Sequence, residues 1–155
     1  MAKKNYEINL LKKLKVLFHN SSKPTNFYSV SDHFRQRYEQ EFSVLETLDW
    51  QTASPKELSN IYEPNTFLTE AAYKYLVPNI FHYCLKYSES IPRVDLVNVF
   101  FLLPVFSTQT DYFCGYSREQ KEVYWKVFTY VNDTLEFDLL DKDDSSQLRI
   151  KLDLD

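Results

Sequence analysis

The chain has 155 residues, a length typical of one folded domain, and 44% of them are hydrophobic and 26% charged. It contains a single glycine, Gly115, which excludes glycine-rich phosphate-binding loops and dinucleotide-binding fingerprints. The formal net charge of −4 disfavours a general nucleic-acid binder, because phosphate contacts need a basic face. We therefore expect one domain spanning residues 1–155, with no nucleic-acid partner.

The rest of the composition predicts an aromatic core and a reducing compartment. The chain has 12 Tyr, 12 Phe and 2 Trp, and most of these rings are expected in the core. Two cysteines, Cys84 and Cys114, are too few to build a disulfide framework. The first apolar stretch is interrupted by lysines, which is not the pattern of a secretory signal. The longest apolar run, Val99 to Phe106, is too short to span a bilayer. We expect a cytoplasmic protein with reduced thiols and no membrane span.

The first predicted element is an amphipathic helix from about Tyr6 to Phe18. Its apolar face is formed by Leu10, Leu11, Leu14, Leu17 and Phe18. The lysines Lys12, Lys13 and Lys15 lie off that face. Two interpretations are open: the lysines meet an anionic surface, or the helix packs on the core with its lysines solvated. We favour the second.

A loop over residues 19–29 precedes a second predicted helix, which begins at Ser31 or Asp32 and runs to about Leu48. The pair Ser54-Pro55 then opens a short helix, because serine is a good cap and proline suits the first helical position. The second helix and the residues after it carry the acidic side chains Glu39, Glu41, Glu46 and Asp49.

Three further helices are predicted in the middle of the chain. Thr69 caps the longest one, which extends to Leu85 and is expected to kink at Pro78. The apolar run Val94 to Leu103 could be a buried helix or a buried strand, and we favour a helix because its neighbours are helical. Ser117 and Gln120 form a capping box that opens a helix to about residue 131.

The C-terminal segment, residues 136–155, is an acidic tail in which the pattern changes to alternation. Apolar residues at 148, 150, 152 and 154 alternate with charged ones, and residues 141–146 are typical of a turn. This predicts two short strands that could pair as a β-hairpin. The expected fold class is thus mainly α: a compact bundle of about five to six helices with a Pro-kinked central helix and a C-terminal hairpin.

One phrase of the sequence resembles the core signature of a small bacterial helical family of unknown function. The phrase runs from Phe67 to Pro78 and follows the pattern Phe-Leu-Thr-x-x-Ala-Tyr-x-Tyr-Leu-x-Pro. Trp50 and Leu58 upstream, and the Ser-x-x-Gln helix start at 117–120 downstream, extend the resemblance over residues 38–131. The resemblance implies a helical fold and brings no activity with it.

Candidate catalytic and metal-binding residues are sparse. The three histidines, His19, His33 and His82, lie on separate segments, and His82 and Cys84 are two residues apart on a helix and diverge. The aspartates at 141, 143 and 144 lack the glycine and distal glutamate of a calcium loop. We therefore expect no catalytic residue, no metal and no cofactor, and a protein that is not an enzyme.

The expected function is protein–protein interaction, specifically an immunity-type protein that binds and neutralises a partner toxin with a basic domain. Such a protein needs acidic residues that steer the partner and aromatic anchors that hold it. The predicted contact residues are Glu39, Glu41, Glu46, Asp49, Asp141, Asp143 and Asp144. These side chains could instead serve only as solubilising surface. The alternative function is a small ligand-binding protein or enzyme with a pocket beside the Pro78 kink.

Overall fold

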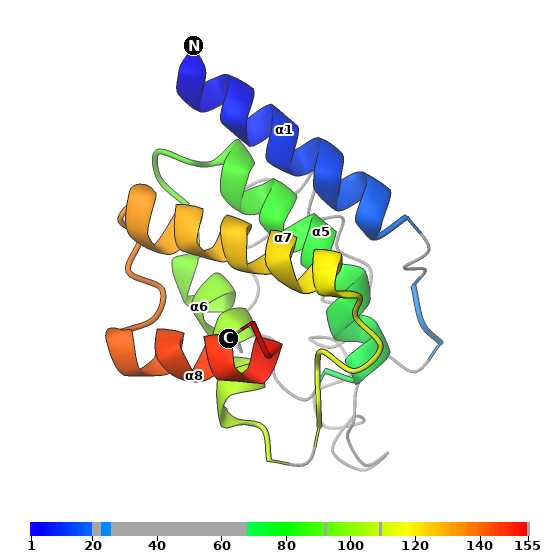
Figure 1. Cartoon of the computed structure of the whole chain (residues 1–155). Coiled ribbons are helices and arrows are strands. Elements are labelled where there is room, and N and C mark those ends of the chain that lie inside the picture. The colour runs from blue at the N-terminus through cyan, green and yellow to red at the C-terminus, as the bar shows by residue number, and fades with distance from the viewer. Residues whose placement is uncertain (20–22, 26–67, 92, 109, 155) are drawn as a thin grey trace.

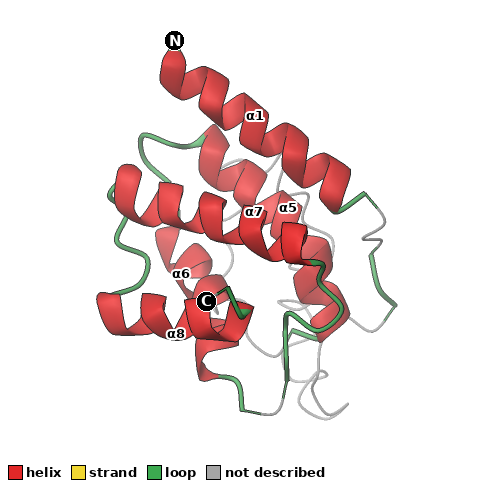
Figure 2. Cartoon of the chain, viewed as in Figure 1, coloured by secondary structure: helices red, strands yellow, loops and turns green. Residues whose placement is uncertain are grey.

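The fold is mainly helical. A computed structural model describes residues 1–19, 23–25, 68–91, 93–108 and 110–154, and this part of the chain contains no strand. Its elements are α1 (Ala2–Leu17), α5 (Glu70–Lys86), α6 (Val94–Phe106), α7 (Arg118–Thr129), the π-helix η1 (Tyr130–Thr134) and α8 (Lys142–Leu152) (Figures 1 and 2). The helices predicted after Ser31 and Ser54 lie outside the described residues.

Side-chain caps fix the starts of two helices where the sequence predicts them. The Thr69 hydroxyl accepts a hydrogen bond from the Ala72 amide at 3.2 Å, which begins α5. At the start of α7, the Ser117 hydroxyl accepts from the Gln120 amide at 3.1 Å, and the Gln120 side chain accepts from the Ser117 amide at 2.8 Å. Both predicted caps are confirmed, including the full capping box.

The apolar run that begins at Val94 is a helix, as predicted, and it continues through Pro104 to Phe106. Likewise, α5 is assigned as one helix on both sides of Pro78. Both helices bury residues on several sides, which is typical of helices at the centre of a domain. The predicted kink at Pro78 stays a prediction.

The helix α7 lies between α1 and α8. On one side it packs against α1, which also contacts α5, and on the other side it contacts α8, which packs mainly on α6. Figure 1 shows α1 along one edge of the molecule and α8 at the opposite edge. This arrangement leaves one side of α1 and one side of α8 facing outward in different directions.

Aromatic rings fill the space between α5, α6 and α7. The ring of Tyr73 stacks on Phe100 with centroids 4.2 Å apart and an interplanar angle of 6°. Its hydroxyl donates to the Phe100 carbonyl at 3.0 Å and lies 2.6 Å from the hydroxyl of Tyr124. Both tyrosines are fully buried, so their polar atoms are satisfied inside the core. The predicted aromatic core is confirmed for the described residues.

The predicted C-terminal hairpin is not what the structure shows, because residues 142–152 form helix α8. Asp141 is its N-cap, acidic residues occupy its first turn, and Arg149 and Lys151 lie in its last turn, where they complement the helix dipole. Leu148 and Leu152, which are four residues apart, are both fully buried. The alternating leucines thus belong to a helical stripe, and Ile150 between them is exposed.

Candidate binding surfaces

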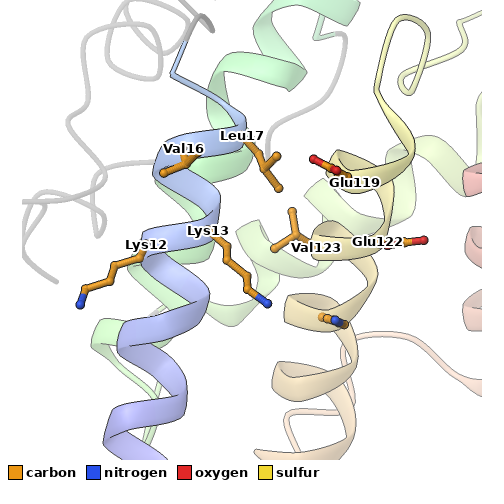
Figure 3. Close-up of a pocket in the computed structure, with 8 residues that line it drawn as sticks. Lys12, Lys13, Val16, Leu17, Glu119, Glu122 and Val123 are labelled. Carbon is orange, nitrogen blue, oxygen red and sulfur yellow. The ribbon is translucent and has the colours of Figure 1, made fainter.

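The first hollow is a groove of about 400 Å³ between α1 and α7 (Figure 3). It is lined by Lys12, Lys13, Val16, Leu17, Glu119, Glu122, Val123 and Lys126. Figure 3 shows the side chains of Leu17, Val123 and Lys13 directed into the gap between the helices, whereas Lys12 points away from it. The same view shows the Glu122 carboxylate directed away from α1, where it pairs with Arg118.

Two polar contacts fix the separation of α1 and α7 at opposite ends of this groove. The Gln120 side chain donates to the carbonyl of Leu17 at 2.7 Å. At the other end, the Tyr130 hydroxyl donates to the carboxylate of Glu7 at 2.8 Å. Between them, Leu10 and Leu14 pack into the core. The packing of this helix on the core is therefore confirmed, and its lysines are exposed. What the lysines meet stays a prediction.

The second hollow, of about 810 Å³, lies where α7 passes into η1 and faces α8. Its lining combines aromatic, acidic, basic and hydroxyl side chains: Trp125, Phe128, Thr129, Asn132, Asp133, Asp138, Leu140, Asp141, Lys142, Ser145, Ser146 and Arg149. We call it the α8 hollow. It brings residues from three consecutive segments to one surface.

An unusual backbone path shapes the α8 hollow. The π-helix η1 widens the last turn after α7, and such turns often occur at functional sites. Glu136 and Asp138 then adopt left-handed backbone conformations with φ of 58° and 48°. The buried Asn132 holds this path, because its side chain accepts from the Leu140 amide at 2.9 Å and donates to Asp133 at 2.8 Å. The side chain of Asn98 also bonds the carbonyl of Leu139.

The aromatic rings in the lining of the α8 hollow form its floor, and charged side chains, three acidic and two basic, surround them as its rim. The half-buried ring of Trp125 contacts Phe128 with centroids 5.4 Å apart, and the guanidinium of Arg149 lies 5.3 Å from the Trp125 centroid. Asp133 and Asp138 are exposed on the rim. A large flat ring beside exposed carboxylates is an arrangement that suits a partner carrying basic side chains.

The structure places the three predicted aspartates at the start of α8. Asp141 lines the hollow, and its carboxylate caps the helix by accepting from the Asp144 amide at 2.8 Å. Asp143 and Asp144 occupy the first turn of α8 beside it. The four acidic residues predicted between 39 and 49 lie outside the described residues. Glu39, Glu41, Glu46 and Asp49 therefore stay a prediction.

Sequence reasoning missed the residues that build the hollow around these aspartates. Trp125, Asn132, Asp133, Asp138 and Arg149 come from segments that look unremarkable one at a time. A helical row from 125 through 129 to 132 was the available signal, since these positions share one face. The approach of α8 to that row follows from tertiary packing.

The two thiols lie in different surroundings. Cys84 is fully buried in α5, and this burial raises the pKa of its thiol. Cys114 is exposed. Within the described ranges, no three His, Cys, Asp or Glu side chains converge in a way that could hold a metal ion. The two hollows described above are lined by α1, α7, η1, α8 and the loop before α8, so neither lies beside Pro78.

Comparisons with known proteins add no relative: no family model, no curated protein and no solved structure matches this chain. The resemblance over residues 38–131 therefore stays a prediction. None of the helices in the described part combines the length and apolar character that crossing a bilayer requires.

Proposed function

We propose that this protein is a non-catalytic, cytoplasmic interaction protein of the immunity type, a compact helical bundle that binds and neutralises a basic toxin domain. The observation that carries the proposal is the α8 hollow, where the ring of Trp125 lies beneath a rim that includes Asp133, Asp138 and Asp141. Tryptophan is the residue type most often found at the energetic centre of protein interfaces. The rim supplies the charge that would select the partner.

The charge of the surrounding segment supports a basic partner. Residues 133–154 contain seven acidic and three basic side chains. The lysine-rich α1 lies at the opposite edge of the molecule, away from this acidic segment. An excess of negative charge around one hollow raises the association rate with a positively charged surface and lowers it for acidic competitors. The aromatic floor then supplies apolar contact once the charges have met.

The experiment starts with the tagged chain in its host, where mass spectrometry identifies a stoichiometric basic partner. The dissociation constant is then measured with the purified pair, and neutralisation is measured as growth of cells that co-express both. The test variant is Asp133→Lys with Asp138→Lys, and the matched control is Glu119→Lys with Glu122→Lys, which makes the same charge change at the other hollow.

We expect the rim variant to bind at least about tenfold more weakly and to lose protection, because exposed interface charges act mainly on association. The control should bind and protect like the unchanged chain. Equal losses in both variants would place the contact elsewhere. A reproducible thermal shift with a metabolite, in a chain that captures no stoichiometric protein, would instead favour the small-ligand alternative.

A further inference from the structure

The side of α1 that faces away from the core carries a defined set of exposed residues. Helical spacing places Lys4, Ile8, Lys12, Lys15 and Val16 opposite the buried Leu10 and Leu14. Ile8 is 40% exposed and Val16 is 69% exposed, so two branched apolar side chains lie among lysines on this surface. We call these five residues the outer face of α1.

The outer face of α1 carries three lysines and no acidic residue. The only acidic residue of α1 is Glu7, which is half-buried and accepts a hydrogen bond from Tyr130. In the part of the chain that the structure describes, no lysine of α1 forms an ion pair with a carboxylate. Within the described residues, the charges of Lys4, Lys12 and Lys15 are therefore available for a contact outside the molecule.

We propose that the outer face of α1 docks on an anionic lipid surface, with the helix lying in the plane of the interface. A helix of 16 residues is about 24 Å long, so lysines spread from Lys4 to Lys15 would meet several headgroups at once. Long lysine stems can reach the phosphates while Ile8 and Val16 enter the boundary between headgroups and acyl chains.

The position of α1 in the fold agrees with such docking. In Figure 1 this helix forms one edge of the molecule, and α8 with its acidic first turn lies at the opposite edge. A bilayer touching α1 would thus stay away from the acidic first turn of α8. The α8 hollow would face the aqueous side, so lipid docking is independent of the proposed partner binding.

A lipid surface explains the face better than an acidic protein does. The outer face is one side of a single helix, whereas a protein partner held by apolar contact usually needs a complementary pocket or groove. Two residues of the outer face, Lys12 and Val16, also line the groove between α1 and α7, but the lining of that groove holds no aromatic side chain that could anchor a protein partner. Exposed apolar side chains together with several lysines on one helix are typical of helices at membrane interfaces.

The test is co-flotation of the full chain with vesicles of phosphatidylglycerol and phosphatidylcholine in equal parts, compared with vesicles of phosphatidylcholine alone. The test variant is Lys12→Glu with Lys15→Glu. The matched control, Lys142→Glu with Lys151→Glu, changes the net charge equally at the opposite edge. A third variant, Ile8→Ser with Val16→Ser, removes the exposed apolar side chains. Circular dichroism confirms that each variant is folded.

We expect the unchanged chain and the control to float with the anionic vesicles at low salt and to be released at high salt. The Lys12 and Lys15 variant should bind about thirtyfold more weakly, and the Ile8 and Val16 variant should also bind more weakly. Equal binding by the two charge variants would overturn the proposal. Retention on immobilised polyglutamate without binding to anionic vesicles would also overturn it, and would assign the face to an acidic protein.

Discussion

The interior around Tyr73 and the rim around α8 are stabilised in different ways. In the interior, stacked rings and hydroxyls that bond one another are removed from water, as in the pair Tyr73 and Tyr124. At the rim, the exposed side chain of Asp141 accepts a hydrogen bond from a backbone amide near solvent. A change in the interior exposes or unpairs buried groups, whereas a change at the rim removes one local bond. The two regions should therefore respond very differently to substitution and to pH.

Alkaline pH should act on the interior most strongly. Burial raises the pKa of Tyr73, Tyr116 and Tyr124, and neighbouring tyrosines add to the effect for the first two. A tyrosine in the unfolded chain ionises near pH 10. The stability that depends on these neutral hydroxyls is thus complete below about pH 10 and is lost as the pH rises above it.

Urea unfolding followed by circular dichroism between about pH 8 and pH 12 would show the loss, and tyrosinate absorbance should appear together with unfolding. A free energy of unfolding that stays constant across this interval would contradict the assignment of these hydroxyls to the core.

Truncation of Tyr73 should cause the largest effect of a single substitution. Tyr73→Ala removes the ring that stacks on Phe100 and the hydroxyl that bonds its carbonyl, and leaves a cavity in a fully buried site. We expect a loss of about 3–5 kcal/mol in the free energy of unfolding, measured in urea. Ile150→Ala, at an exposed position of α8, is the control and should change stability by less than about 0.5 kcal/mol.

Removing the hydroxyls of Tyr73 and Tyr116 one at a time measures what a hydrogen bond contributes, because each substitution by Phe keeps the ring in place. Tyr73→Phe leaves the Phe100 carbonyl and the Tyr124 hydroxyl without their partner, so it should cost about 1–3 kcal/mol. The Tyr116 hydroxyl is buried without a hydrogen-bond partner among the described residues, although a lysine ammonium lies over its ring. Tyr116→Phe should therefore be neutral or stabilising in the same urea experiment. A similar loss in both variants would mean that the hydrogen bonds of Tyr73 do not account for the cost of removing its hydroxyl.

At the rim, removing the cap of α8 should have the smallest effect of the series. Asp141→Ala eliminates the bond to the Asp144 amide and a favourable charge at the helix N-terminus, for an expected cost of about 1 kcal/mol. Ser145→Ala lies in the same helix, away from the cap, and should be close to neutral. Thermal unfolding followed by circular dichroism can compare the two. An Asp141 effect as large as that of Tyr73→Ala would remove the distinction between rim and interior.

The sequence was sufficient to predict the parts of the fold that depend on local chemistry. Thr69 and Ser117 mark helix starts because their hydroxyls can satisfy free amides one turn later, and this requires no knowledge of the rest of the chain. Similarly, the long apolar run from Val94 could be assigned to a buried element and, given its helical neighbours, to a helix.

The C-terminal tail shows where such reasoning stops. Leu148 and Leu152 satisfy a period of two and a spacing of four equally well, so the pattern could not separate a strand from a helix. Asp141 and the basic residues near 149–151 were the deciding signals, because they fit the two ends of a helix dipole. The α8 hollow was beyond prediction, since it depends on left-handed residues at 136 and 138 and on the approach of α8 to Trp125.

The placement of α1 and α8 at opposite edges has a consequence for handling the protein. Five lysines lie on α1 and seven acidic side chains lie between residues 133 and 154, so within the described residues opposite charges gather at opposite edges. A protein with such an uneven charge distribution can bind a charged resin through its oppositely charged edge, whatever the sign of its net charge. Despite a pI near 5.4, the chain should be retarded at neutral pH and low ionic strength on sulfonate columns as well as on quaternary-amine columns.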